Sequence, residues 1–258
     1  MLKNIKEYVA MRKQNIAHKV DKLVSPPSLL IIQTGDSEAS NRYVRNKVKD
    51  CEEVGIYADV IKMYHAEYYH AKYITDCLSK HYQGVIVQLP TSIENPQNLF
   101  HECQDVDGFK NPNVVPCTAK GIIDYLDYCG YKDFSGKDVL IINRSDIVGR
   151  PLAKQFLDRN ATVTVAHSKT ENLQRKIAQA DIIVTAVGKA GFITKDMIRD
   201  DQIVIDVGIN FDENGKICGD CERGIGDNVT PVPGGVGLLT RLALLDNIML
   251  LNPNKREV

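Results

Sequence analysis

The 258-residue sequence lacks three features that would mark a nucleic-acid-binding, membrane or secreted protein. It has no excess of charge: the formal net charge is -1 and the pI is about 6.6, so no basic field invites a nucleic-acid partner. No apolar run reaches the roughly 18 residues needed to span a bilayer. The N-terminus, MLKNIKEYVAMRKQ, lacks the apolar centre of a signal peptide. We therefore expect a cytoplasmic protein with no membrane partner and no nucleic-acid partner.

The sequence also lacks an ordered set of cysteines. Its 7 cysteines are odd in number and scattered, which argues against a disulfide framework and fits a reducing compartment. Cys218 and Cys221 have C-x-x-C spacing, but a zinc site usually uses a second such pair and the sequence has none. We therefore expect no metal site and interpret the pair as two thiols in a loop, with a redox role as the alternative.

Short apolar runs alternate with longer helical patterns along the chain. The hydrophobic content of 43% and the charged content of 25% are ordinary for a globular protein, and the length fits two domains. Alternating strands and helices predict parallel β-α-β units. We expect an α/β protein with an N-terminal α/β substrate domain and a Rossmann-like dinucleotide-binding domain built on a parallel sheet.

The first domain is predicted over residues 1–117. Its strands are expected at 28–34, 57–63 and 84–89, and its helices near 2–22, 38–54 and 66–81. A final helical segment, 237–258, is expected to pack back on this domain.

The second domain is predicted over residues 118–236. Its strands are expected at 138–142, 161–166, 181–187 and 202–207, and its helices near 118–129, 149–159, 170–178 and 195–199. All four strands are rich in Val and Ile, as strands covered on both faces tend to be. Such a series predicts a doubly wound sheet.

The turn after the first strand of this domain lacks the G-x-G-x-x-G sequence of most Rossmann sites. The segment Asn143–Pro151 keeps only Gly149. In a Rossmann unit this turn holds the pyrophosphate at a helix N-terminus, and Arg144 and Ser145 could donate to phosphate. A purely structural turn is the alternative.

An acidic residue is also absent where the second strand of this domain ends. An NAD site usually places an acid there for the ribose 2′-hydroxyl. Here the chain reads Val165-Ala166-His167-Ser168-Lys169-Thr170, with hydroxyls and potential cations. This favours NADP over NAD; alternatively, Ser168 or Thr170 caps the next helix.

Tyr43 and Lys47 lie four residues apart on a predicted helix and therefore share one face. One aromatic ring and one amine on a cleft wall could stack a planar substrate and move a proton. An exposed surface contact is the alternative interpretation of such a pair.

The segment Tyr43-Val44-Arg45-Asn46-Lys47 resembles the Y-V-x-x-K signature of the bifunctional methylenetetrahydrofolate dehydrogenase/cyclohydrolase family. Six further segments match this family in the same order: Val87–Pro90, Asp105–Phe109, Pro116–Thr118, Arg144–Pro151, Asp206–Asn210 and Thr230–Gly237. The resemblance covers roughly residues 28–250, and the last segment, TPVPGGVG, is the most specific.

The resemblance implies an enzyme of one-carbon metabolism, which serves purine biosynthesis. It would oxidise methylenetetrahydrofolate with NADP and hydrolyse the methenyl product to 10-formyltetrahydrofolate. Lys47 matches the catalytic lysine, Gln88 the residue that orients it, Asp107 the carboxylate that grips the pterin, and Tyr43 the stacking aromatic. The remaining substrate contacts implied are Val87, Leu89, Pro233, Gly234 and Gly235, and the cofactor contacts are Asn143, Arg144, Ser145, Ser168 and Ile209. The family also implies a homodimer.

Several positions depart from the family pattern. They are Thr91-Ser92, Gln104, Ala119, Asn143 and Leu238, and the usual opening strand is missing. Asn143 leaves room for weakened cofactor binding and thus for a cyclohydrolase alone, whereas Lys47 argues against a dehydrogenase alone. A folate-binding protein without turnover is a third reading, which the intact set of Tyr43, Lys47, Gln88 and Asp107 disfavours.

Overall fold

The computed structural model describes residues 1–63 and 81–252, and the chain divides into two compact units. Unit 1 comprises residues 1–9 and 118–240, and unit 2 comprises residues 10–117 and 241–258. Within the described ranges, no helix is both long enough and apolar enough to cross a bilayer.

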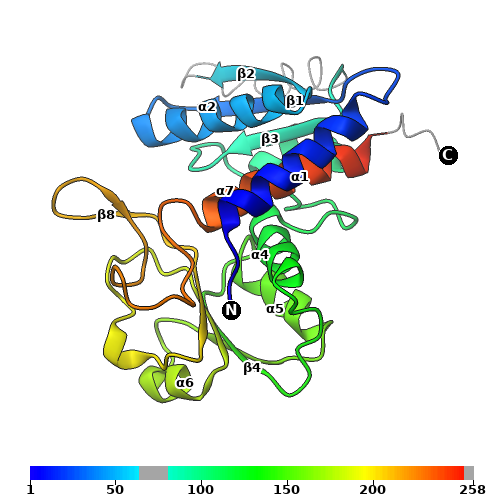
Figure 1. Cartoon of the computed structure of the whole chain (residues 1–258). Helices are drawn as coiled ribbons and strands as arrows, with labels where there is room; N and C mark the ends of the chain where they lie inside the picture. The colour runs from blue at the N-terminus through cyan, green and yellow to red at the C-terminus, as the bar shows by residue number, and fades with distance from the viewer. Residues whose placement is uncertain (64–80, 253–258) are drawn as a thin grey trace. The chain divides into compact units, whose positions relative to one another are not determined.

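Unit 2 contains a parallel three-stranded sheet in the order β2-β1-β3, as the α/β prediction requires (Figure 1). The strands are β1 (Ser28–Thr34), β2 (Tyr57–Met63) and β3 (Gly84–Gln88), so two predicted strands are confirmed to the residue and the third ends one residue early. The central strand β1 is buried from its second residue onward, and β3 is buried throughout. These two strands therefore supply much of the apolar core of this unit.

Two long helices belong wholly or partly to unit 2. Helix α2 (Glu38–Glu53) begins where the Ser37 side chain accepts a hydrogen bond from the Ser40 amide, a capping interaction that starts helices. Helix α1 (Ile5–Val20) is shorter at both ends than the predicted helix 2–22. The predicted helix 66–81 lies outside the described residues except for its last position.

The segment after β3 is folded although it gave no periodic signal. It contains two short 3₁₀ helices, Pro96–Leu99 and Glu102–Gln104. Helices of three or four residues are too short to show a hydrophobic period, which explains why the sequence did not reveal them.

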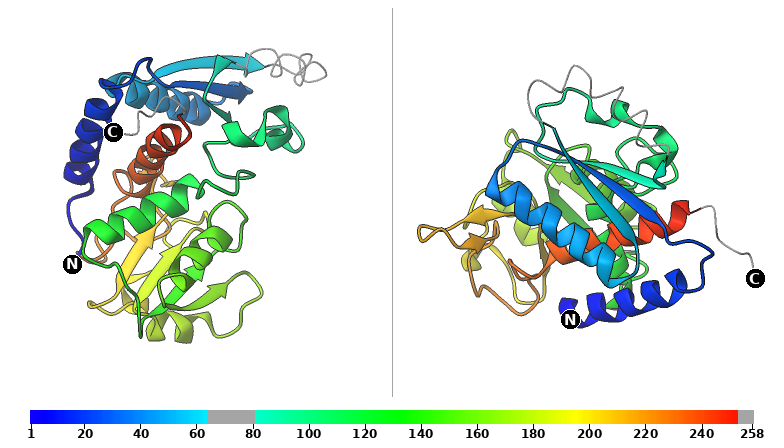
Figure 2. Two further views of the ribbon diagram at one scale, coloured as in Figure 1. Left: turned by 90° about the vertical axis from the view of Figure 1, so that its right-hand side faces the viewer. Right: turned by 90° about the horizontal axis from the view of Figure 1, so that it is seen from above.

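Unit 1 contains a parallel four-stranded sheet in the order β5-β4-β6-β7, which confirms the predicted Rossmann-like sheet (Figure 2). The strands are β4 (Asp138–Ile142), β5 (Thr162–Ala166), β6 (Ile182–Thr185) and β7 (Ile203–Asp206). The helices of this unit include α4 (Cys117–Tyr128), α5 (Gly149–Leu157) and α6 (Leu173–Gln179). The predicted helix near 195–199 is a single 3₁₀ turn, Lys195–Met197.

One expectation about this sheet was wrong. Strand β5 is not covered on both faces: Thr162, Thr164 and Val165 are exposed, and only Ala166 is fully buried. β5 lies at one edge of the sheet, next to β4 alone, whereas β7 at the other edge is buried throughout. The two exposed threonines stand at alternate positions of β5 and therefore share one face of the strand.

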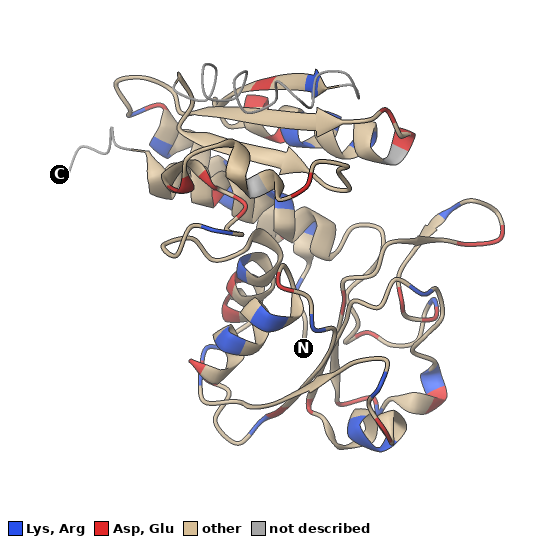
Figure 3. Ribbon diagram, turned by 180° about the vertical axis from the view of Figure 1, so that it is seen from behind, with Lys and Arg blue, Asp and Glu red and all other residues tan. Residues whose placement is uncertain are grey.

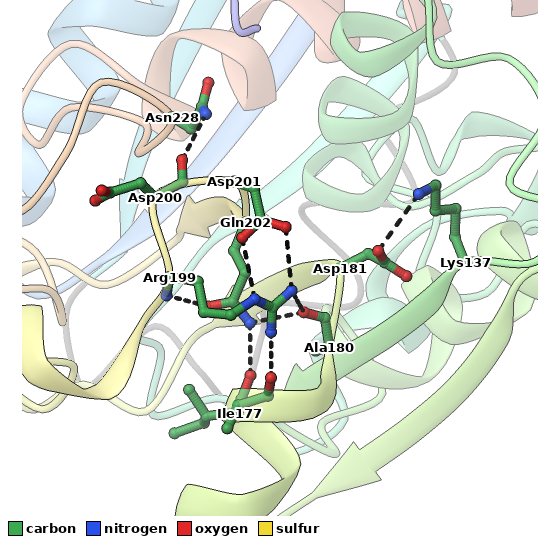
Figure 4. A network of polar contacts seen from close by, with 10 residues as sticks. Lys137, Ile177, Ala180, Asp181, Arg199, Asp200, Asp201, Gln202 and Asn228 are labelled. Carbon is green, nitrogen blue, oxygen red and sulfur yellow. Dashed lines mark hydrogen bonds and ion pairs between the residues drawn. The ribbon is translucent and has the colours of Figure 1, made fainter.

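The C-terminal end of α6 is held by a polar network (Figure 4). The buried Gln202 donates from Nε2 to the carbonyls of Ile177 and Ala180, and its Oε1 accepts from the Arg199 amide. The Arg199 guanidinium donates to the carbonyls of Ala178 and Ala180. Helix termini leave such carbonyls without intrahelical partners, so these two side chains fix the connection from α6 into β6.

A small antiparallel hairpin of β8 (Asn210–Phe211) and β9 (Ile217–Cys218) follows the main sheet in unit 1. Cys218 and Cys221 are both free and buried, and burial raises the pKa of the Cys221 thiol. Cys221 belongs to the apolar core, and no cluster of metal-binding side chains occurs in the described residues. The last helix, α7 (Val236–Leu251), supplies residues to both units.

Charged residues of both signs are interspersed along the ribbon, and neither sign forms a continuous field in the view of Figure 3. This distribution agrees with the balanced composition of 32 Lys and Arg against 33 Asp and Glu.

Candidate functional site

Helix α2 presents Tyr43 and Lys47 one helical turn apart, as the sequence predicts. Lys47 is only 8% exposed, which is unusual for a lysine, and Tyr43 is half-buried. Burial raises the pKa of the Tyr43 hydroxyl, while the charges of Arg241 and Arg42 oppose the rise. Both side chains therefore lie against protein and not on an open surface, which removes the surface-contact interpretation.

Asp107 lies within electrostatic reach of Lys47. Burial raises the pKa of the Asp107 carboxyl, and the Lys47 ammonium is the main influence that lowers it. The Cys117 thiol also lowers this pKa, by less than Lys47 does. Unit 2 thus brings a buried amine and a partly buried carboxylate from distant parts of the sequence into one site.

The backbone that carries Asp107 is held by its neighbour Asp105. The Asp105 carboxylate is 1% exposed and accepts hydrogen bonds from the amides of Gly108, Lys110 and Asn111 at 2.6–3.2 Å. Gly108 has a φ of +80°, and a Cβ there would clash with the backbone of residues 114–116. This turn therefore has one shape available to it.

A buried asparagine on α7 holds the same loop from the other side. Asn247 is fully buried and donates from Nδ2 to the carbonyl oxygens of Val106 at 2.9 Å and Val115 at 3.2 Å. The same nitrogen lies 3.5 Å from Cys117 Sγ, and that thiol donates to the Val106 carbonyl. Asn247 therefore connects the two chain segments that flank Asp107.

Two buried glutamines lie near the carboxyl ends of neighbouring strands: Gln88 is the last residue of β3 and Gln33 is the last but one of β1. Gln88 on β3 and Gln33 on β1 are partners in the strand register. Gln88 donates to the Leu89 carbonyl at 2.7 Å, and Gln33 donates to Asn41 on α2 at 2.7 Å. The Oε1 atoms of both have no hydrogen-bond partner among the described residues. A buried acceptor without a donor is energetically unfavourable. These two oxygens are therefore available to accept a hydrogen bond from a bound ligand or from a lysine side chain.

Val87 and Leu89, the predicted substrate contacts on either side of Gln88, differ in how far they are exposed. Val87 is buried in the core of unit 2, and Leu89 is half-buried. Thr91, a departure from the family pattern, accepts a hydrogen bond from Thr34 at 2.8 Å. The hydroxyl therefore connects the loop after β3 to the end of β1.

The remaining predicted substrate residues, Pro233, Gly234 and Gly235, belong to unit 1. Gly234 has a φ of +100°, and a Cβ on Gly235 would clash with the Pro231 carbonyl. Both positions therefore require glycine for backbone reasons alone.

The turn after β4 is closed by the side chain of Asn143. Its Oδ1 accepts from the Ser145 amide, the Ser145 hydroxyl and the Gly149 amide at 2.7–3.1 Å. The Arg150 amide donates to the Ser145 carbonyl, and Pro151 has no amide hydrogen. The first amides of α5 are thus already paired, so phosphate recognition here depends on side chains more than in a standard Rossmann turn.

Arg144 and Ser168 follow paired strands. Ile142 at the end of β4 is the register partner of Ala166 at the end of β5, and each of the two residues comes two positions later. Both are exposed, and Arg144 makes no ion pair with any described residue. This edge offers a guanidinium and a hydroxyl, which suits a phosphate group.

Ile209 is 45% exposed and lies between two residues held by buried carboxylates. Asp206 accepts from the Gly208 amide, and Asp220 accepts from the Asn210 side chain. The supporting roles of Asp220, Asp105 and Asn247 were not predicted from the sequence. A polar residue inside an apolar context was the available signal for Asn247 alone, in the run LLDNIMLL.

The sequence matches both parts of one protein family. The profile described as "Tetrahydrofolate dehydrogenase/cyclohydrolase, catalytic domain" matches residues 3–107, and the profile described as "Tetrahydrofolate dehydrogenase/cyclohydrolase, NAD(P)-binding domain" matches residues 116–256. The bifunctional protein FolD of Ruthia magnifica subsp. Calyptogena magnifica is 40% identical over 264 residues, covering 94% of this chain and 95% of the relative. That of Lysinibacillus sphaericus is 39% identical over 255 residues, with 89% and 88% covered.

Crystal structures of proteins from the same family are also similar to this chain. The bifunctional enzyme FolD, methylenetetrahydrofolate dehydrogenase/cyclohydrolase, from Campylobacter jejuni superposes with a TM-score of 0.90 at 35% identity, covering 97% of this chain and 98% of that one. The Trypanosoma brucei N5,N10-methylenetetrahydrofolate dehydrogenase-cyclohydrolase, complexed with NADP cofactor and inhibitor, gives a TM-score of 0.88 at 25% identity, with 97% and 96% covered.

Proposed function

The chain belongs to the tetrahydrofolate dehydrogenase/cyclohydrolase family, and from this premise we propose that it carries out both reactions of its relatives. It oxidises 5,10-methylenetetrahydrofolate to the methenyl form with NADP and hydrolyses that product to 10-formyltetrahydrofolate. The observation that carries the proposal is the buried Lys47 within electrostatic reach of the partly buried Asp107 in unit 2. The carboxamide oxygen of Gln88, at the end of β3, adds a buried acceptor that has no partner among the described residues.

Asp107 binds the pterin in this proposal. A carboxylate can accept two parallel hydrogen bonds from the ring N–H and amino groups of a pterin. The Asp105 turn and Asn247 fix its backbone, so the carboxylate loses little freedom when substrate binds. Tyr43 supplies the aromatic face on which the folate stacks.

Lys47 performs the proton transfer of the hydrolytic step. Hydrolysis of a methenyl cation requires a group that exchanges protons with the attacking water, and in this proposal Nζ of Lys47 is that group. The free Oε1 of Gln88 accepts a hydrogen bond from the lysine and thereby orients it. Retention of this pair supports cyclohydrolase activity beside the oxidation and disfavours a binding protein without turnover.

NADP fits the residues at the carboxyl edge of the unit 1 sheet. When bound, it accepts a hydride from the methylene carbon, so the protein mainly positions the two reactants. Arg144 and Ser168 would hold the 2′-phosphate, since both follow the paired ends of β4 and β5 and no acid occurs in the segment Val165–Thr170. Asn143, Ser145 and Ile209 would contact the remainder of the dinucleotide.

One absorbance assay tests the function. Methylenetetrahydrofolate and NADP are mixed with the full-length chain, and the methenyl product is followed over time. Formation followed by enzyme-dependent decay supports both activities. Stable accumulation would leave the dehydrogenase alone, decay of added methenyl substrate without formation would leave the cyclohydrolase alone, and no reaction would leave a binding protein.

We further propose that the chain works in the cytoplasm as a homodimer, on the basis of the family resemblance. Sedimentation equilibrium of the purified chain tests the assembly: a mass near twice 28.8 kDa is expected, and a monomer would contradict the proposal.

A further inference from the structure

Two buried carboxylates in unit 1 have no part in the reaction proposed above. Asp206 ends β7 and is 2% exposed, and Asp220 follows the hairpin and is 0% exposed. Thr185, which ends β6, is the register partner of Asp206. Both carboxylates therefore belong to the carboxyl edge of the sheet, where Rossmann-like domains bind their ligands.

The carboxylates interlock through backbone amides. Asp206 accepts from the amides of Gly208, Asp220 and Cys221 at 2.8–2.9 Å. A Cβ on Gly208 would clash with the Asp220 carboxylate, and one on Gly219 would clash with that of Asp206. The two carboxylates thus occupy the space that a side chain at position 208 or 219 would need, so both positions require glycine.

Asp220 accepts hydrogen bonds from four donors in two chain segments. Thr185 Oγ1 and the Val187 amide donate to Oδ2, and the Lys189 amide and Asn210 Nδ2 donate to Oδ1, at 2.6–3.1 Å. This carboxylate therefore holds the loop after β6 and the residue that follows Ile209.

All the donors that these two carboxylates receive are electrically neutral. Amides, one hydroxyl and one carboxamide stabilise the charge, but within the described ranges neither carboxylate forms an ion pair. The exposed side chain of Lys189 lies on the same loop, where water screens its charge. The edge of β6 and β7 therefore carries negative charge that neutral donors stabilise but that no cation pairs with among the described residues.

The strand order indicates which half of the cofactor would lie near Asp206 and Asp220. The residues proposed to hold the 2′-phosphate follow β4 and β5, and the order is β5-β4-β6-β7. A dinucleotide anchored there by its adenosine half directs its nicotinamide half toward β6 and β7. Val187 and Ile209 lie on that side. The Val187 amide donates to Asp220, and so does the side chain of Asn210, which follows Ile209.

We propose that Asp206 and Asp220 make unit 1 favour the oxidised form of NADP over the reduced form. The oxidised nicotinamide ring carries a positive charge and the reduced ring is neutral, so a buried negative charge nearby stabilises only the former. Both aspartates act as positioning residues as well, since they hold the loops beside the ring. This inference rests on the proposed NADP function.

Equilibrium binding of both cofactor forms tests the inference without turnover. NADPH is titrated into the full-length chain by its fluorescence, and NADP is titrated by displacement of NADPH. Asp220→Asn and Asp206→Asn each remove one charge and keep the side-chain shape. Thr185→Val removes one donor to Asp220 but keeps both charges, and Asp196→Asn removes an exposed charge from the same unit.

The ratio of the two dissociation constants, Kd(NADP)/Kd(NADPH), is expected to rise about threefold to tenfold in Asp220→Asn and Asp206→Asn. It should not change in Thr185→Val, even if both affinities fall together, nor in Asp196→Asn. An unchanged ratio in both aspartate variants would overturn the inference and leave a purely structural role. If Asp220→Asn does not fold, Asp206→Asn decides alone. Wild-type protein that binds neither cofactor form would instead overturn the proposed function itself.

Discussion

Lys47 on α2 opposes the effect of burial on Asp107: burial raises the pKa of the Asp107 carboxyl, and the lysine ammonium lowers it. The net result is a pKa above the ordinary value of about 3.9 for an aspartate. The ionised carboxylate is the form that accepts hydrogen bonds from a pterin. The chemistry of the two residues is therefore linked, although they lie far apart in the sequence.

Folate affinity should consequently depend on pH through Asp107. As the pH falls through the raised pKa, the carboxyl gains a proton, loses acceptor capacity and binds the pterin less tightly. Calorimetric titration with a folate between about pH 4 and pH 8 measures this. Asp107→Asn is the control, because its affinity should be low and nearly independent of pH. A wild-type affinity that stays constant over this range would contradict the assignment.

Asp107→Ala should reduce folate binding and leave NADP binding nearly intact. Loss of the carboxylate leaves pterin donors unpaired in a partly buried site, at a cost of about 1–3 kcal/mol. Calorimetry with each ligand separates the two effects. Unchanged folate affinity in this variant would remove Asp107 from the substrate site.

Lys47→Met should reduce the cyclohydrolase rate about 10²–10⁴-fold, the usual effect of removing an acid–base group. The methionine keeps most of the side-chain length but has no amine. Dehydrogenation should fall less, since hydride transfer requires no proton acceptor.

Lys47→Arg is the matched variant for this prediction. It keeps the positive charge but should not restore hydrolysis, because a guanidinium does not release its proton in the working range. A Lys47→Met enzyme that converts methenyl- to formyltetrahydrofolate at the wild-type rate would defeat the mechanism.

Arg144→Ala should raise the KM for NADP much more than the KM for NAD. A charge-assisted contact to phosphate is worth about 1.5–3 kcal/mol, which corresponds to about ten- to a hundredfold in affinity. Steady-state kinetics with both cofactors measures the difference. Arg150→Ala is the control, since Arg150 is exposed and paired with Asp146. Equal losses for NADP and NAD in Arg144→Ala would show that Arg144 does not read the 2′-phosphate.

Asn247→Leu should destabilise the protein and weaken folate binding together. The substitution leaves the buried carbonyls of Val106 and Val115 without this donor, which costs about 1–3 kcal/mol. Urea unfolding gives the loss of stability, and the KM for methylenetetrahydrofolate reports the movement of Asp107. Leu250→Ala, on an exposed position of the same helix, should change neither by much. A destabilised Asn247→Leu enzyme with an unchanged KM would mean that Asn247 does not position Asp107.

The sequence predicted the parts of the fold that repeat over several residues. Strands such as Ser28–Thr34 and Asp138–Ile142 were located to the residue because continuous apolar runs mark buried parallel strands. The hairpin of β8 and β9 was missed because two residues per strand show no alternation. The exposed side of β5 was missed because sheet order, which makes it an edge, depends on tertiary structure.

The site was predicted unevenly for a similar reason. Motifs identified the residues proposed to contact ligands, such as Lys47 and Asp107, since reactive side chains recur in short recognisable patterns. The residues that support the site act through hydrogen bonds to backbone groups, which are far away in the sequence for Asp220 and Asn247 and within one turn for Asp105. Only a folded structure shows which amides and carbonyls those side chains reach.

The turn closed by Asn143 also determines how a cofactor can arrive. Its Oδ1 accepts three hydrogen bonds and its Nδ2 donates to the Ala186 carbonyl at 2.7 Å, so the turn is ordered before anything binds. Fixing the backbone of one residue costs about 1–2 kcal/mol of entropy, and here that loss belongs to folding and not to association. The turn acts as a rigid template: deuterium exchange at the Gly149 amide should be slow in the free protein, and association should need no loop closure.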